Sequence, residues 1–419
     1  MTAVDIGQTP YTLISSDCHA GASHDTYRTY LEERYLDDFD AWRAKYKNPF
    51  RDLQGTERDR NWNNERRISE LEDDGIVGEV IFPNTVPPFF PSMALLARPP
   101  SPDDFELRLA GIRAHNRWLA DWCGEYPERR AGIGQIFLND VDEAIADVRW
   151  IKEHHLRGGI LIPSVPPDAK HIDPLYSAKY DPVWAVCEEL QLPVHCHSGP
   201  APHEDYGEVR GWMSVYGYET IFFTARPLWF MLLTGVFERF PRLKMAVTEA
   251  GAYWAADMLW RMDMMATRDH GARKMVDTRG TLTMLPSEYF DRNCAIGASN
   301  TRRRELGRRY EIGVGNIMWG NDFPHPEGTW PYTRSFLKDR FWDIPVEETE
   351  RILGLNQAEF YRFDLGQLQP IADRIGPTPA DLGQTDESVT ARWEPLRRAG
   401  RPWLSGVEAV DVLAVTERG

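Results

Sequence analysis

Residues 132–163 read GIGQIFLNDVDEAIADVRWIKEHHLRGGILIP, and they contain the repeating unit that decides the fold. An apolar run at 132–138 is followed by residues 141–155, in which apolar side chains recur at helical spacing. A second apolar run follows at 159–163. This order predicts two parallel strands that are joined by a helix.

The same unit recurs along most of the chain. The predicted strands are residues 11–16, 78–83, 132–138, 159–163, 193–197, 243–248, 292–297 and 317–320. The predicted helices are residues 64–74, 103–125, 141–155, 181–190, 227–240, 253–269, 301–311 and 346–356. Eight repeats with right-handed connections predict an α/β fold, a closed (β/α)8 TIM barrel over residues 1–370. An open doubly wound sheet is the alternative, but no glycine-rich motif follows the first strand to support it.

Three segments exceed the connections of a minimal barrel. Residues 24–63 and 198–225 follow the first and fifth predicted strands, so we expect both insertions at the C-terminal face, where barrel active sites form. Residues 371–419 are rich in glycine and proline and predict an irregular C-terminal extension. This arm either packs on the barrel or on a neighbouring subunit, or it is disordered.

The composition is that of an ordinary globular protein. The 419 residues are 42% hydrophobic and 27% charged, with a formal net charge of −16. Because the acidic excess is spread along the chain, neither nucleic acid nor an anionic membrane surface is an expected partner. No run reaches the roughly 18 apolar residues of a membrane span, which predicts a cytoplasmic protein. Five widely spaced cysteines predict reduced thiols rather than a disulfide framework.

Metal-type side chains occur where the first predicted strand ends. Asp17 and His19 are two positions apart, so on an extended chain both side chains point to the same face, while Cys18 points to the other. A turn aspartate beside a core histidine would explain this pair taken alone.

Residues 193–197, PVHCH, repeat this geometry in the fifth strand. His197 lies nearer the predicted barrel mouth and is the better metal ligand. His195 lies deeper, so we expect it to support a ligand or to contact the substrate; a buried histidine bonded to a backbone carbonyl is the alternative.

The eighth strand ends in residues 319–326, WGNDFPHP, where Asp322 can join a mononuclear site. A helix cap is the alternative role for this aspartate alone. Donor clusters at the ends of strands one, five and eight would meet at one mouth. Together they predict a site for one divalent metal ion.

These motifs, with the closing sequence ILGLNQAEFYRFD at 352–364, resemble the amidohydrolase superfamily. The branch that they resemble contains aminocarboxymuconate-semialdehyde decarboxylase and the hydroxybenzoate decarboxylases. The resemblance implies a metal-bearing barrel with Asp17, His19, His197 and Asp322 as ligands. It also implies a non-oxidative decarboxylase of a small cyclic or aromatic carboxylate, and, with the long tail, a homo-oligomer such as a dimer.

The sequence departs from this family pattern at two positions. Asp17 stands where His or Glu is usual, and Glu249 stands where the decarboxylases have a histidine after the sixth strand. Glu249 is therefore predicted to be an acid or base beside Asp322, which would align the metal and move a proton. Hydrolysis of a lactone, an amide or a carbon–carbon bond, with Glu249 as general base, is the alternative reaction. A metal-free binding or assembly protein is a second alternative.

The remaining expectations concern the metal and the substrate contacts. Zn²⁺ is the first choice of metal and Mn²⁺ the second. Arg302 could bind a substrate carboxylate, although a solvated basic face is the other reading of its cluster. Trp212 could wall a ring pocket, unless its insertion packs on itself. His325 is predicted to contact the substrate.

Overall fold

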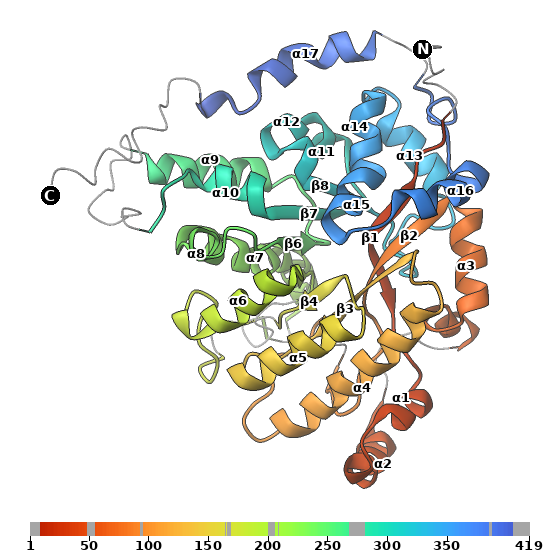
Figure 1. Cartoon of the computed structure of the whole chain (residues 1–419), viewed down its shortest axis with the longest axis vertical. Helices are drawn as coiled ribbons and strands as arrows, with labels where there is room; N and C mark the ends of the chain where they lie inside the picture. The colour runs from red at the N-terminus through yellow and green to blue at the C-terminus, as the bar shows by residue number, and fades with distance from the viewer. Residues whose placement is uncertain are drawn as a thin grey trace, which may run out of the picture.

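Eight parallel strands form one sheet in the order β1 to β8, with helices around it (Figure 1). The computed structural model describes residues 9–47, 55–92, 95–163, 165, 169–199, 206–207, 209–267, 281–384 and 388–404. The strands are β1 (Leu13–Ala20), β2 (Ile76–Pro83), β3 (Arg130–Gln135), β4 (Gly159–Leu161), β5 (Val194–His197), β6 (Met245–Thr248), β7 (Cys294–Ser299) and β8 (Ile317–Gly320).

Backbone hydrogen bonds just beyond β8 join the last strand to the first. The Asp322 N–H donates to Asp17 O at 2.9 Å, and the His19 N–H donates to Phe323 O at 2.7 Å. Cys18 and Phe323 form a parallel bridge between these segments. The contacts complete the circuit of strands and confirm the predicted (β/α)8 barrel.

The helices lie outside the strands. They are α1 (His24–Tyr30), α2 (Leu36–Lys45), α3 (Asn64–Asp73), α4 (Phe105–Gly124), α5 (Val141–Glu153), α6 (Asp181–Leu190), α7 (Trp212–Leu233), α8 (Val236–Arg239), α9 (Ala255–Ala266), α10 (Pro286–Asn293), α11 (Arg303–Gly307), α12 (Arg309–Ile312), α13 (Thr333–Phe341), α14 (Val346–Glu350), α15 (Asn356–Tyr361), α16 (Leu365–Ile375) and α17 (Val389–Ala399). A π-helical segment, Arg351–Leu355, joins α14 to α15.

Helix α5 shows how the sequence sets this pattern. The Asp140 carboxylate caps the helix by accepting hydrogen bonds from two backbone N–H groups of the first turn. Ala144, Val148 and Ile151 follow at helical spacing and are fully or almost fully buried against the strands. This apolar stripe is the helical spacing from which the sequence predicted the helix.

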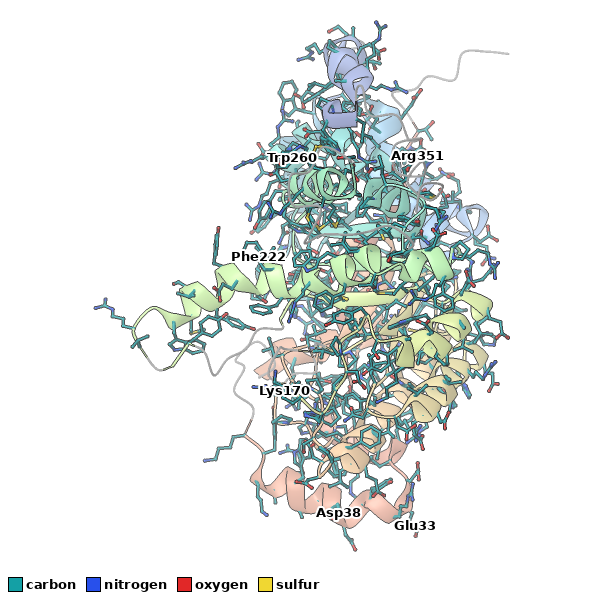
Figure 2. All side chains as sticks on the ribbon, turned by 90° about the vertical axis from the view of Figure 1, so that its left-hand side faces the viewer. Glu33, Asp38, Lys170, Phe222, Trp260 and Arg351 are labelled. Carbon is teal, nitrogen blue, oxygen red and sulfur yellow. The ribbon has the colours of Figure 1, made fainter. Side chains whose placement is uncertain are left out.

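The insertion at 198–225 differs from its prediction as a loop. Residues 212–225 form the first half of α7, which continues through Pro227, the expected helix start. Figure 2 shows this half, with Phe222 on it, projecting from the body of the barrel. A proline inside a helix loses one backbone hydrogen bond, and here the residues on both sides of Pro227 keep the helix going. Insertion 24–63 contains α1 and α2, and its residues 48–54 lie outside the described part of the chain.

The C-terminal extension is helical in part, where the sequence predicts irregular structure. Helix α17 ends shortly before Arg401, which forms a two-bond ion pair with Asp291 of α10 at 2.7 Å. The Trp403 indole N–H donates to Asp263 of α9 at 2.9 Å. Arg401 and Trp403 therefore fix the end of the described extension on the barrel, and residues 385–387 and 405–419 lie outside the described part.

Two further predictions concern the whole chain. All five cysteines are buried and free of disulfide bonds in the structure, and their reduced state stays a prediction. Within the described residues, we find no helix that is both long and apolar enough to cross a membrane.

Candidate metal centre and active site

Two ligand-type side chains come from β1. A register shift between Ser15 and Cys18 interrupts the pairing with β2. Asp17 and His19 are fully buried, with His19 Nε2 at 3.3 Å from Asp17 Oδ1 and 3.2 Å from Asp322 Oδ1. Nε2 of His19 is buried and makes no hydrogen bond, although it faces these two carboxylates.

His197 enters the same cluster from the end of β5. Its Nε2 lies 3.1 Å from Asp17 Oδ1, and its Nδ1 lies 3.1 Å from Ser198 O. If Nδ1 carries the proton and donates to that carbonyl, the Nε2 lone pair faces the cluster. This orientation is the one that a histidine metal ligand requires.

Asp322 and Glu249 follow β8 and β6 in an unusual backbone conformation. Their φ angles are 59° and 60°, in the left-handed region that residues other than glycine rarely adopt. Such strain is tolerated where the surrounding structure enforces it, and it concentrates at functional sites. The conformation turns both carboxyl groups toward the strand ends that also present His19 and His197.

The chemistry of the donor set fits a divalent cation. Asp17 and Asp322 are two buried carboxylates, with side chains 0% and 1% exposed, and no described Lys or Arg forms an ion pair with either. Burial opposes their ionisation, but hydrogen bonds and charge from neighbouring histidines lower the pKa of both below its usual range. Two carboxylates and two imidazoles with no other counter-charge match the ligands of Zn²⁺ or Mn²⁺ sites.

Glu249 and His325 lie beside this donor set. Glu249 Oε2 is 3.4 Å from His197 Nδ1, and its side chain is 25% exposed. Burial and the charge of Asp322 raise the pKa of Glu249 to about 8. His325 Nδ1 is 2.9 Å from Asp322 Oδ1, and its ring stacks on His19 with centroids 4.1 Å apart.

His195 lies deeper in β5 and apart from the metal-type groups. Its Nε2 is 2.8 Å from Gly158 O, and its ring stacks on Tyr361 with centroids 5.6 Å apart. Burial lowers the pKa of His195 to about 3, so the ring is neutral. These contacts are those of the alternative interpretation, a buried histidine bonded to a backbone carbonyl.

The structure does not bring Arg302 or Trp212 to the donor set. Arg302 precedes α11 and its side chain is exposed. Trp212 begins α7, twelve residues before Thr224, which is a distance of about 18 Å along a helix. Its ring lies beside Tyr216 instead, as the alternative of an insertion packed on itself predicted.

Two site residues escaped the sequence analysis. The Ser299 hydroxyl donates a short hydrogen bond to Asp17 Oδ2, and the Asn84 side chain lies 3.2 Å from His325 Nε2. Both are polar residues at or just beyond strand ends, which was the available signal. Strand seven was predicted to end at 297, two residues too early, so Ser299 was placed outside it.

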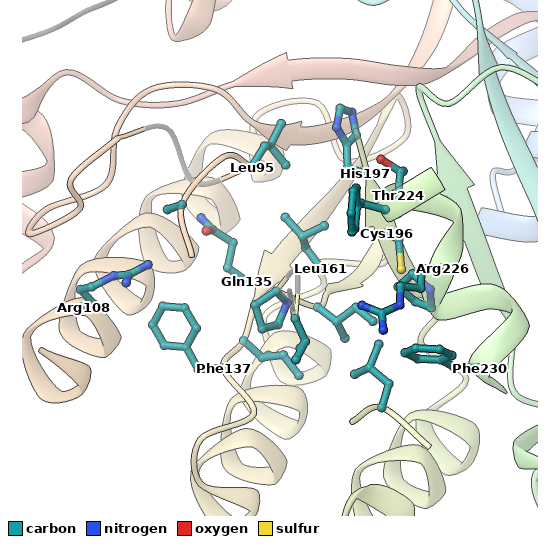
Figure 3. Close-up of a pocket in the computed structure, with 18 of the residues that line it drawn as sticks. Leu95, Arg108, Gln135, Phe137, Leu161, Cys196, His197, Thr224, Arg226 and Phe230 are labelled. Atoms are coloured by element: carbon teal, nitrogen blue, oxygen red, sulfur yellow. The ribbon is translucent and has the colours of Figure 1, made fainter. Parts of the chain in front are cut away.

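A pocket extends from His197 between β3, β4, β5 and α7 (Figure 3). Its cavity volume is about 50 Å³. Apolar side chains such as Phe137, Leu161 and Phe230 form most of its wall. This narrow, mostly apolar space opens beside His197, one of the candidate ligands.

Comparison with known proteins identifies the family. The amidohydrolase family model matches residues 17–363, most of the chain, so the protein belongs to this family, as the motifs suggested. Gamma-resorcylate decarboxylase of Rhodococcus jostii (strain RHA1) is 25% identical over 232 residues, which are 51% of this chain and 65% of that enzyme. The matched segment thus spans less than two thirds of this curated relative.

Solved structures share the fold at low identity. The 5-carboxyvanillate decarboxylase from Sphingomonas paucimobilis has a TM-score of 0.62 and 21% identity, over 84% of this chain and 100% of that one. A dihydroxybenzoic acid decarboxylase from Polaromonas sp. JS666, with bound manganese and the inhibitor 2-nitroresorcinol, has a TM-score of 0.57 and 18% identity. That match covers 84% of this chain and 97% of that one.

Proposed function

We propose that the protein is a metal-dependent decarboxylase of a small aromatic or cyclic carboxylate. The observation that carries this proposal is the buried convergence of Asp17, His19, His197 and Asp322 at one mouth of the barrel. The decarboxylases among its relatives support the reaction type.

The four convergent residues would hold one divalent ion. A bound ion would supply Lewis-acid chemistry, drawing electron density from substrate oxygens and fixing their position. Manganese in a solved relative supports Mn²⁺ for this chain, and zinc stays a prediction.

The side chains around the ligands would handle the proton. Decarboxylation breaks the ring–carboxylate bond, releases carbon dioxide and needs one proton at the vacated carbon. Asp322 is held between His19 and His325, which suits it to fix the ligand set. Glu249 is a quarter exposed, so it can deliver a proton and regain one from solvent. The apolar pocket would keep other water from the reacting carbon.

Turnover with loaded metal tests the proposal. The protein incubated with Mn²⁺ should release carbon dioxide from ring acids such as 2,6-dihydroxybenzoate, and Asp322→Asn should abolish the release. Asp38→Asn, on the exposed face of α2, makes the same chemical change elsewhere and should leave the rate unchanged. Release at equal rates from Asp322→Asn and the unchanged protein would refute the assignment.

One observation favours hydrolysis as a second candidate. Glu249, a carboxyl group rather than an imidazole, is placed beside His197 and could act as a general base toward water. Uptake of oxygen-18 from water into the organic product, without carbon dioxide, would support that reaction.

Four other expectations from the sequence stay predictions. They are the single barrel unit over 1–370 with its extension over 371–419, the dimer, the cytoplasmic location and the roles given to individual site residues. A protein without bound metal or turnover would revive the alternative of a binding or assembly protein.

A further inference from the structure

The pocket beside His197 contains two arginines, Arg108 and Arg226, in a mostly apolar wall. Arg226 lies on α7, one turn before Phe230, and its guanidinium stacks on the Phe230 ring at 4.7 Å from the ring centroid. Figure 3 shows this guanidinium directed toward Leu161, with His197 at the other end of the pocket.

Arg226 has no carboxylate partner in the part of the chain that the structure describes. Neither Asp nor Glu forms an ion pair with it there, and Tyr176 is the neighbouring group that favours its charged form. Burial lowers the pKa of Arg226, because the charged form loses hydration without gaining a counter-charge. A half-buried guanidinium in this state would gain from a ligand that brings a carboxylate.

The second arginine of the pocket differs in this respect. Arg108 Nη2 donates to Arg98 O at 2.7 Å, and Nη1 lies 3.4 Å from Asp104. Its guanidinium also stacks on Phe90 at 4.4 Å from the ring centroid. Both terminal nitrogens of Arg108 therefore have partners in the wall, although its Nε has none, whereas Arg226 pairs with no carboxylate of the described residues.

Gln135 provides an independent sign that the pocket binds a polar ligand. The residue is 5% exposed, and its amide Nε2 has no hydrogen-bond partner. A buried amide donor normally finds an acceptor, since leaving it unsatisfied costs about 1–3 kcal/mol. Gln135 lines the same pocket as Arg226, so a ligand with polar substituents could satisfy both.

We propose that this pocket binds a planar ring acid with a second carboxylate, and that Arg226 holds the second carboxylate. The inference rests on the proposed function, since the first carboxylate is the one that would be lost near His197. Aromatic side chains line the walls and suit a flat ring. A guanidinium fits a carboxylate with two parallel hydrogen bonds, which makes Arg226 a specificity-determining residue for the diacid.

Binding measurements on metal-loaded protein test this inference. The ligands are benzoate and the 1,2-, 1,3- and 1,4-dicarboxylates of benzene, titrated by calorimetry at pH 7. The protein should bind at least one diacid about tenfold or more tightly than benzoate, as a charge-assisted hydrogen bond predicts. Arg226→Gln should remove that preference, so that the diacid binds no more tightly than benzoate, and Arg226→Lys should keep part of it.

Arg398→Gln is the matched control. Arg398 is exposed on α17 and pairs with Glu394, so the same change of charge there should leave the diacid preference intact. Thermal unfolding of each variant shows whether it is folded. A diacid preference that survives in folded Arg226→Gln would overturn the inference, and so would failure of all three diacids to bind more tightly than benzoate. A preference that depends on Arg226, with no carbon dioxide released from any ring acid, would refute the proposed decarboxylation and leave the inference standing.

Discussion

Replacing Glu249 with glutamine tests the residue on which the proposed chemistry most depends. The amide has almost the same shape, and His197 Nδ1 keeps Ser198 O as its hydrogen-bond partner, so metal binding should persist. It cannot give or take a proton at physiological pH. We expect turnover to fall by about 10²–10⁴-fold, which is the usual contribution of a general acid or base.

The contact between Glu249 and His197 allows the loss of proton transfer to be distinguished from the loss of a positioning role. The contact between Glu249 Oε2 and His197 Nδ1 is 3.4 Å long, beyond the best hydrogen-bond distance, and the carboxyl is 25% exposed. Water screens such a contact, so losing its charge alone should cost about 1 kcal/mol or less, a rate factor below about tenfold. Loss of proton transfer corresponds to about 3–5 kcal/mol of activation free energy.

The assay is the initial rate of carbon dioxide release at saturating substrate, with manganese content measured on the same sample. Glu33→Gln, on the exposed surface, is the matched control and should be unchanged. A rate for Glu249→Gln within tenfold of the unchanged protein would refute the role in proton transfer. Loss of the metal in this variant would instead indicate that Glu249 is a metal ligand.

Three further predictions follow from single contacts. His197→Asn should lose bound manganese. His195→Asn should keep the manganese and lower the thermal stability, because His195 bonds Gly158 O and stacks on Tyr361. Metal loss in His195→Asn and metal retention in His197→Asn would contradict the assignment of His197 as the ligand. Glu79→Gln should lower the free energy of unfolding, measured in urea, by about 3–5 kcal/mol, because Glu79 neutralises two buried guanidinium groups. A decrease below about 1 kcal/mol would disprove this stabilising role. Burial opposes ionisation of Glu79, but the charges of Arg67 and Arg130 lower its pKa in the folded protein. The stabilisation by Glu79 is therefore complete above the unfolded carboxyl pKa of about 4.3, and it is lost as the pH falls through the lower folded pKa. Unfolding midpoints that stayed constant from pH 5 to pH 3 would argue against this pH dependence.

The barrel could be predicted because its signals are local. In α5 the cap at Asp140 and the apolar stripe through Ile151 lie within a dozen residues of each other. Asp17 and His19 could be assigned to one face because alternation along a strand depends only on neighbouring residues. The half of α7 before Pro227 was missed, since the proline looked like a helix start and the preceding glycines looked like a loop.

The sequence allowed prediction only of those site residues that lie at the ends of strands. Residues with metal-type chemistry stood out where β1, β5 and β8 end. The contacts of Ser299 with Asp17, and of Asn84 with His325, join segments that are far apart in the sequence, and no local pattern encodes them. The depth of His195 depends in the same way on Tyr361, which lies beyond the eighth strand.

The proposed decarboxylation depends on a metal held by Asp17, His19, His197 and Asp322. Its most direct test is to follow a ring acid that the manganese-loaded protein consumes in oxygen-18 water, measuring carbon dioxide and the label in the organic product together. We expect one carbon dioxide for each molecule consumed and no label in that product. Labelled organic product without carbon dioxide would contradict it and establish a hydrolase.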